Sequence, residues 1–298
     1  MTTKPSAGPG FPPPNPNPST PHLALPPGSC DSHCHVFGPF ARHPLPVDRR
    51  FTPHETPETA LRALQQRLGL SRAVIVHSTG HGMDHGPLLD ALAAGRGRYR
   101  GVAILKPSAT AAELRRYHAT GIRGVRFNFL AHLGGRPDTG AMQAVFDLVR
   151  PFGWHVALHG AGRDLVDYRD FIAGIDLPVV IDHMARPDLR EGLEGPTVLA
   201  LKRLLDGGRV WVKLSGADRV SREGPPYGDA VRLARDLAAD APERVLWGSD
   251  WPHVNIEGPM PDDGKLVDLI AEIAPAEAAR RKMLVENPAE FFGFDPPV

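Results

Sequence analysis

The sequence is poor in cysteine. Among its 298 residues only Cys30 and Cys34 carry thiols. On one extended segment they would lie about 13 Å apart at ~3.3 Å per residue, beyond the ~7 Å between Cα atoms that a disulfide tolerates. Two unbridged thiols are typical of the reducing cytosol, so we expect a cytoplasmic protein.

An excess charge and long apolar runs are also absent. Lys plus Arg and Asp plus Glu number 34 each, so the formal net charge is zero. Bulk charge therefore gives no reason to expect a nucleic acid or an anionic membrane as partner. No apolar run approaches the ~20 residues that span a bilayer, and none follows Lys4 as a secretory signal requires. A small anionic substrate stays open, and so does a homo-oligomer.

Proline, by contrast, is abundant at the N-terminus. Residues 1–28 are dominated by Pro, Asn, Ser and Gly. Because proline lacks a backbone N–H and fixes φ, this composition predicts an extended or disordered tail. The chain therefore divides into a disordered Pro-rich tail, 1–28, and a folded unit, 29–298.

After residue 29, short β-branched runs alternate with amphipathic stretches. Near-continuous apolar runs predict parallel strands buried on both faces. The expected strands are 30–37, 72–78, 100–105, 123–127, 154–159, 178–183, 210–214 and 244–249. The expected helices are 56–69, 110–121, 140–152, 163–174, 196–206, 227–239, 264–273 and 275–286, with a less regular pattern at 86–95. This alternation predicts an α/β fold, a (β/α)8 TIM barrel. No glycine-rich nucleotide motif follows the first strand to favour an open sheet.

Active sites of such barrels form at the C-terminal ends of the strands. Side chains able to do chemistry stand at these ends: His33, His35, His77, Ser78, Arg126, Asn128, His159, Asp182, His183, Lys213, Ser215 and Asp250. A barrel would gather them around one mouth. The period of two places His33 and His35 on the same face of their strand and turns Cys34 away.

Histidines with one aspartate support two interpretations. His33, His35, His159, His183 and Asp250 can form an imidazole and carboxylate metal site with room for water. The same side chains can instead hydrogen-bond a substrate carbonyl without a metal. From residue types alone, both interpretations stay open.

Two arginines are candidate anion clamps. The planar guanidinium of Arg126 suits a substrate carboxylate, although an ion pair with a neighbouring carboxylate explains it equally well. Arg219 lies in an expected loop above the mouth, as either a clamp or a solvated charge. Ser78 and Thr79 begin the glycine-rich segment 78–86, which is also expected over the mouth.

Two other sets of histidines are not expected to act in the site. His81 and His85, in the same segment, are expected to be exposed to solvent. His155 shares a strand face with His159 but lies deeper, so we interpret it as core.

With these residues in view, the chain resembles the lactonase branch of the amidohydrolase superfamily. The matching stretches are DSHCHVFGP, GIRGVRFNF, VVIDHMARPD, RVLWGSDWPH and MPDDGKLVD, and the resemblance extends from about residue 26 to 293. It is similar in particular to the 2-pyrone-4,6-dicarboxylate lactonases and the related 4-sulfomuconolactone hydrolases. The resemblance implies a hydrolase acting on a carboxylic ester.

The dicarboxylate lactonases work without a metal, and their site maps onto this chain. Their histidines fall on His33, His35 and His183, and their general base falls on Asp250. Two of their arginines match Arg126 and Arg219. The resemblance thus implies that water activated by Asp250 attacks a lactone carbonyl polarised by histidines.

Three positions depart from that pattern. The metal-free enzymes have a tyrosine at His159, a carboxylate-binding arginine at His132 and a substrate-contacting tyrosine at Phe51. His159 restores the fifth-strand histidine that metal-dependent amidohydrolases use as a ligand. The other two changes remove parts of a carboxylate pocket, which favours a lactone with a different second anion, such as a sulfonate.

We therefore expect a metal-assisted lactonase of aromatic compound degradation. Zn²⁺ or another divalent ion would be held by His33, His35, His159 and Asp250. Asp250 and His183 would be catalytic, and the substrate-binding residues would be Arg126, Arg219, His132, Phe51, Ser78 and Thr79. The rival interpretations are a metal-free 2-pyrone-4,6-dicarboxylate lactonase, a metal-dependent decarboxylase of an aromatic acid and a non-catalytic ligand-binding barrel.

Overall fold

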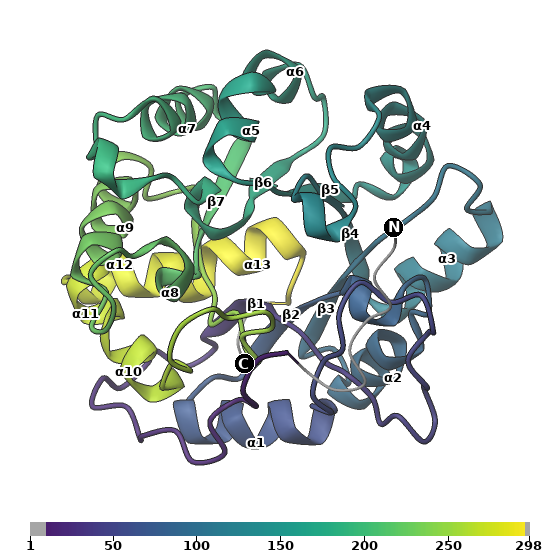
Figure 1. Cartoon of the computed structure of the whole chain (residues 1–298), viewed down its shortest axis with the longest axis horizontal. Coiled ribbons are helices and arrows are strands. Elements are labelled where there is room, and N and C mark those ends of the chain that lie inside the picture. The colour runs from purple at the N-terminus through teal and green to yellow at the C-terminus, as the bar shows by residue number, and fades with distance from the viewer. Residues whose placement is uncertain (1–9, 296–298) are drawn as a thin grey trace.

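The computed structural model describes residues 10–295, in which eight parallel strands form a barrel (Figure 1). Neighbouring strands follow chain order from β1 to β8. The strands are β1 (Cys30–Cys34), β2 (Arg72–Val76), β3 (Tyr99–Ala103), β4 (Ile122–Asn128), β5 (His155–His159), β6 (Val179–Ile181), β7 (Val210–Leu214) and β8 (Val245–Trp247). The predicted TIM barrel is confirmed, and both cysteines are unbridged.

Helices surround the sheet and connect its strands (Figure 1). They are α1 (Glu58–Leu68), α2 (Gly86–Gly95), α3 (Ala111–Thr120), α4 (Thr139–Val149), α5 (Gly162–Asp167), α6 (Arg169–Ala173), α7 (Pro196–Asp206), α8 (Ala217–Val220), α9 (Gly228–Asp240), α10 (Asp263–Asp268), α11 (Ile270–Ile273), α12 (Glu277–Arg281) and α13 (Asn287–Phe292). Within residues 10–295, none of these helices is long and apolar enough to cross a bilayer.

The observed helices differ from the predicted ones mainly in where they are interrupted. The expected helix 163–174 is divided into α5 and α6, and 264–273 is divided into α10 and α11. The expected last helix continues through the π-helical turn Lys282–Glu286 into α13. The irregular pattern at 86–95 forms α2.

Apolar side chains fill the lower part of the barrel. Inward-facing residues of the strands form one cluster with the aromatic end of the chain: Cys30, Val74, Val76, Val102, Ala157, Val180, Trp211, Leu246, Phe292 and Phe294. A larger cluster lies between the strands and the helices. This packing closes the base of the barrel.

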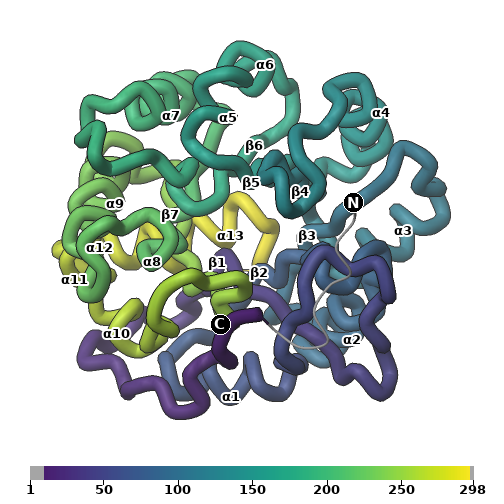
Figure 2. Tube along the Cα trace, in the orientation of Figure 1, coloured from purple at the N-terminus to yellow at the C-terminus, as the bar shows by residue number. Residues whose placement is uncertain are grey.

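The Pro-rich segment differs from the expectation. Residues 10–28 form no helix or strand, yet they lie against the barrel beside α1 and α10 (Figure 2). The Ser19 N–H donates to Asp262 Oδ1 over 3.0 Å, and Asp268 accepts two further backbone N–H groups. These carboxylates satisfy donors that an irregular chain cannot satisfy internally. The prediction of disorder is therefore wrong for residues 10–28, and residues 1–9 of the predicted tail lie outside the described residues.

His155 belongs to the core, as expected. Its ring centroid lies 4.8 Å from that of Phe291 and 5.3 Å from that of Phe292 at the base of the barrel. Burial, assisted by the charge of Lys213, lowers the pKa of His155 from 6.5 to about 3.

This shift predicts a contribution of His155 to acid denaturation. The unfolded chain binds a proton at His155 below pH 6.5, whereas the folded chain stays neutral there until about pH 3. The stabilisation is therefore present above pH 6.5 and is lost as the pH falls toward 3. His155→Leu should reduce the slope of the unfolding free energy against pH between pH 4 and 6 by about 1.4 kcal/mol per pH unit, because one proton fewer is taken up on unfolding. Urea titrations across this range measure it, and an unchanged slope would contradict the assignment.

Candidate active site

One cavity of about 560 Å³ lies at the C-terminal ends of the strands, within the size range of small-molecule sites. All six expected substrate-binding residues line it, and so do four of the five expected catalytic and metal-binding residues. These ten are Phe51, Ser78, Thr79, Arg126, His132, Arg219, His35, His159, His183 and Asp250. The fifth, His33, is fully buried beside them.

Three imidazole nitrogens converge on one oxygen of Asp250. The Nε2 atoms of His33 and His35 each lie 3.6 Å from Asp250 Oδ1, and the Nε2 of His183 lies 3.8 Å from it. The His33 and His35 rings meet edge to face with centroids 5.1 Å apart. Strand parity thus placed both rings on the same side of β1.

Backbone hydrogen bonds between β1 and the chain after β8 bring these groups together. Asp250 N–H donates to His33 O over 2.8 Å, and His35 N–H donates to Trp251 O over 2.8 Å. The strands approach so closely that a Cβ on Gly248 would lie 2.7 Å from the Cβ of His33. Only glycine fits this position without a shift of the backbone.

The turn after β6 presents His183 in an unusual backbone conformation. Residues 183–186 all have positive φ, with values of 52°, 52°, 62° and 46°. Each such residue costs about 1–2 kcal/mol when it carries a Cβ, and such strain is concentrated at functional sites. The His183 Nδ1 lies 2.9 Å from Ser215 Oγ. A Cβ on Gly216 would approach that ring to 3.0 Å, so the glycine leaves room for it.

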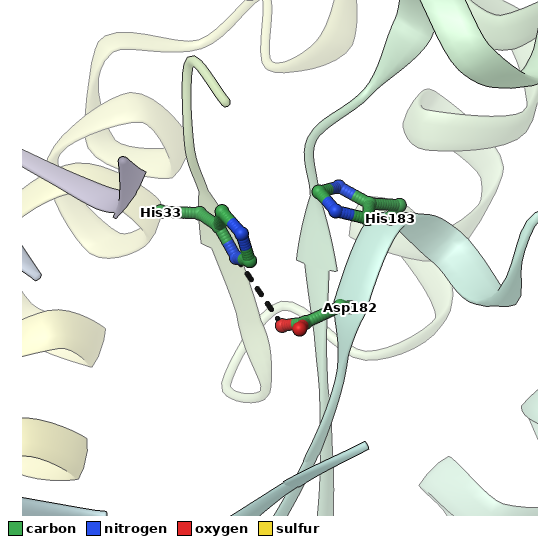
Figure 3. Close-up of side chains that lie close together, drawn as sticks. All are labelled: His33, Asp182 and His183. Carbon is green, nitrogen blue, oxygen red and sulfur yellow. Dashed lines mark ion pairs between the residues drawn. The ribbon is translucent and has the colours of Figure 1, made fainter. Parts of the chain in front are cut away.

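A fully buried carboxylate, Asp182, lies behind the histidines. Its Oδ2 accepts a hydrogen bond from Arg126 Nε over 3.0 Å, and its Oδ1 lies 3.1 Å from Lys213 Nζ. Figure 3 shows the ring of His33 directed at this carboxylate, with 3.3 Å between Nδ1 and Oδ1, and His183 beside it. Burial raises the pKa of Asp182, but the charge of Lys213, the neighbouring imidazole of His33 and the charge of Arg126 outweigh burial and hold it well below the usual range.

Arg219 forms an ion pair with Asp250. Its Nε donates to Asp250 Oδ2, and its Nη2 donates to Val254 O over 2.9 Å. Burial raises the pKa of Asp250, but Arg219 and the neighbouring imidazoles of His183 and His35 hold it well below the usual range. Asp250 is therefore ionised at neutral pH. Both arginines that were candidate anion clamps are thus already paired with buried carboxylates.

His183 and His159 are neutral at pH 7. Burial lowers the pKa of His183 to about 3 and that of His159 well below 6.5, with nearby arginines contributing to both shifts. His35 Nδ1 lies 2.7 Å from Val76 O, which can only accept, so Nδ1 carries a proton and Nε2 is the nitrogen that faces Asp250. His159 Nδ1 lies 3.0 Å from Asn128 Oδ1.

This donor set fits a divalent cation. Two groups of three ligand atoms within 4.8 Å of one another occur in the described residues: His33, Asp182 and His183, and His33, His35 and Asp250. In the described part of the chain, His33 Nε2 has no hydrogen-bond partner. Neutral imidazoles whose Nδ1 atoms are engaged elsewhere are typical zinc ligands.

His159, the remaining expected ligand, stands apart from these groups. It belongs to neither of them, and its ring centroid lies 5.2 Å from that of His183. The structure therefore brings together three members of the expected ligand set, His33, His35 and Asp250, and places His183 nearer to them than His159.

The other histidines near the mouth are not exposed, contrary to expectation. His81 and His85 are 2% and 4% exposed. His81 stacks on Phe37 with ring centroids 5.8 Å apart, and His85 stacks on His77 at 4.1 Å. Aromatic packing thus buries the histidines of segment 78–86, which its glycines had predicted to be a loop.

Sequence reasoning missed two cationic residues of the site. Lys213 was noted at a strand end but given no role, yet it is the buried partner of Asp182. Arg186 lines the cavity. It stands three residues after His183, within a stretch that resembles the lactonase branch, and this nearness to His183 could have identified it as a site residue.

The fold and the site define an α/β-barrel protein with a histidine and aspartate centre at the C-terminal ends of its strands. The chain belongs to the Amidohydrolase family, whose sequence profile matches residues 30–294.

Two curated relatives are similar over almost the whole chain. A 2-pyrone-4,6-dicarboxylate hydrolase from Comamonas testosteroni is 40% identical over 93% of both chains. A 4-sulfomuconolactone hydrolase from Rhizobium radiobacter is 42% identical over 91% of this chain and 92% of the relative. Among solved structures, an apo protein from Agrobacterium tumefaciens has a TM-score of 0.82 and 32% identity, covering 93% of this chain and 99% of its own.

Lys213 should be required for stability because it compensates a buried charge. Lys213→Met leaves Asp182 with one cation fewer in a fully buried position, and loss of one member of a buried pair costs about 3–5 kcal/mol. The control is Lys202→Met, since Lys202 pairs with Asp236 and Asp240 at the surface, where a pair is worth about 0–1 kcal/mol. Urea unfolding measures both, and equal losses would contradict this role of Lys213.

Proposed function

We propose that this protein is a hydrolase that opens a small anionic lactone in the degradation of aromatic compounds, with a sulfonated muconolactone as the substrate type. The observation that carries the proposal is the ionised Asp250 carboxylate, which faces three imidazole Nε2 atoms at 3.6–3.8 Å inside a cavity of substrate size. Both curated relatives are named as hydrolases of lactones of this kind, which supports it.

Asp250 is proposed to move the proton. Its carboxylate accepts a proton from the water whose oxygen attacks the lactone carbonyl carbon, as a general base. As the bond between that carbon and the ring oxygen breaks, the protonated Asp250 returns the proton to the ring oxygen. Arg219 supports this role, because its ion pair keeps Asp250 ionised before the reaction.

His183 is proposed to stabilise the tetrahedral oxyanion. Ser215 can donate to His183 Nδ1 across 2.9 Å, which leaves the proton on Nε2. An Nε2–H in a buried site is a preorganised donor for the developing negative charge. The left-handed turn after β6 and the close approach of Gly216 hold the ring in this position.

Arg126 is proposed to orient the substrate. Its Nε is occupied by Asp182, but its terminal nitrogens make no hydrogen bond to any residue between 10 and 295. Since Arg126 also lines the cavity, these nitrogens can receive a substrate oxygen while Asp182 fixes the guanidinium plane. Holding the reactants in place in this way makes the attack effectively intramolecular.

A divalent ion, Zn²⁺ for the ligand types present, is proposed to be held by His33, His35 and Asp250, with His159 as the further ligand. When bound, it would supply Lewis-acid polarisation of the carbonyl and a lowered pKa of water. The fit rests on the convergence of the first three and on the unpartnered Nε2 of His33.

The reaction is tested with a panel of small lactones, followed by ultraviolet absorbance, proton release and carbon dioxide measurement. We expect one proton per lactone opened, no carbon dioxide, and higher kcat/KM for sulfonated or carboxylated lactones than for neutral ones. Carbon dioxide released from an aromatic acid would identify a decarboxylase instead. A protein that turns over neither class would be a binding barrel, and the proposal would fail.

The same assay tests the metal. Treatment with a chelator should remove zinc in step with activity and lower kcat by at least about a hundredfold, since a metal supplies several kcal/mol of charge stabilisation. Adding zinc back should restore activity. Full activity in protein shown to be metal-free by elemental analysis would contradict the metal and leave the metal-free lactonase mechanism.

A further inference from the structure

Arg186 differs from the other arginines that line the cavity. Three of these are paired with carboxylates: Arg126 with Asp182, Arg219 with Asp250 and Arg222 with Asp188. The guanidinium of Arg186 makes no hydrogen bond and no ion pair with any residue in the described stretch 10–295. Among the four arginines that line the cavity, Arg186 is therefore the one without a carboxylate partner in the described residues.

Hydrogen bonds hold the backbone of Arg186, whereas its guanidinium has none in the described residues. Its N–H donates to His183 O over 2.9 Å, and its own carbonyl accepts from Gly162 N–H over 3.2 Å. Its φ of 46° belongs to the same left-handed turn that presents His183. One strained turn therefore carries both a catalytic candidate and an unpaired cation, so a group bound by Arg186 would lie close to the reacting carbonyl.

The surroundings of Arg186 favour an anion. Arg186 is half-buried, and burial together with Arg219 lowers its pKa. Burial and the charges of Arg186 and Arg219 also lower the pKa of His132, which lines the same cavity. His132 is consequently neutral at pH 7 and cannot supply the second positive charge. A half-desolvated guanidinium without a partner is costly unless a ligand compensates it.

Asp218 is the internal alternative partner. It lines the same cavity, and its buried carboxylate oxygens have no hydrogen-bond partner in the described residues. The two side chains nevertheless do not form an ion pair, and burial raises the pKa of Asp218. Because no ion pair joins the two side chains, Asp218 does not occupy the guanidinium of Arg186 in the described structure.

We propose that Arg186 binds the second anionic substituent of the substrate, a carboxylate or sulfonate on the lactone ring, and thereby sets the preference for dianionic over monoanionic ligands. The planar, forked guanidinium matches both groups in bidentate geometry. The assignment of this anion to a lactone rests on the proposed function, whereas the binding of a dianion by Arg186 does not.

Binding of unreactive ring compounds tests the proposal without turnover. The probes are 3-sulfobenzoate and isophthalate, which carry two anions, and benzoate, which carries one. Isothermal titration calorimetry on the wild type should show tighter binding of both dianions by at least about tenfold, as expected for a partly buried charge pair. Arg186→Gln should reduce this ratio to less than about twofold while benzoate binding changes little, and Arg186→Lys should restore part of it.

Arg190→Gln is the matched control. It removes one positive charge from the same segment, but Arg190 is exposed and paired with Asp188, so the dianion preference should persist. Preference retained in Arg186→Gln, or lost equally in Arg190→Gln, would overturn the proposal. Loss of the preference in Asp218→Asn alone would identify Asp218 rather than Arg186 as its determinant, and would overturn it too.

Kinetic measurements on the wild type and Arg186→Gln distinguish failure of this proposal from failure of the proposed function. If no lactone is opened by the wild type, the proposed function fails, while the calorimetric ratio still decides the role of Arg186. If lactones are opened, Arg186→Gln should raise KM for sulfonated lactones and leave kcat/KM for a neutral lactone within about twofold. A fall in kcat of equal size for both would contradict a role in anion binding.

Discussion

The backbone hydrogen bonds that join β1 to the chain after β8 are the constraint on which the site depends. They pair His33 with Asp250 and His35 with Trp251 at 2.8 Å, and Gly248 makes the close approach sterically feasible. Without this closure, the first-strand histidines would not face Asp250. The same contacts close the barrel, so the hydrogen bonds that position the site also hold the fold together.

Burial of two carboxylates imposes the second constraint. Desolvation alone raises the pKa of Asp182 and Asp250, yet both are held ionised by cations that reach them from other strands and loops. Lys213 and Arg126 hold Asp182 from one side of the site, and Arg219 holds Asp250 from the other. Most of the positive charge around the cavity is thus used to maintain the site itself, and Arg186 is left available for a substrate anion.

The sequence predicted the parts of this arrangement that depend on periodicity. Eight buried runs indicated the barrel, and a spacing of two residues placed His33 and His35 together. It could not predict distances that depend on side-chain packing, such as the separation of His159 from the ligand groups. It also could not predict the left-handed turn that presents Arg186, since residues with a Cβ rarely adopt that conformation. Composition misjudged residues 10–28, because the acceptors that fix them lie more than two hundred residues away.

Asp250 is the group proposed to move the proton, with histidines and arginines arranged around it. Single-turnover measurement of lactone opening by Asp250→Asn tests this most directly, because the amide keeps the shape of the side chain and removes its basicity. We expect a loss of at least about a thousandfold in the rate of opening, near the usual contribution of a positioned general base, with lactone binding retained. An undiminished rate in Asp250→Asn would contradict it.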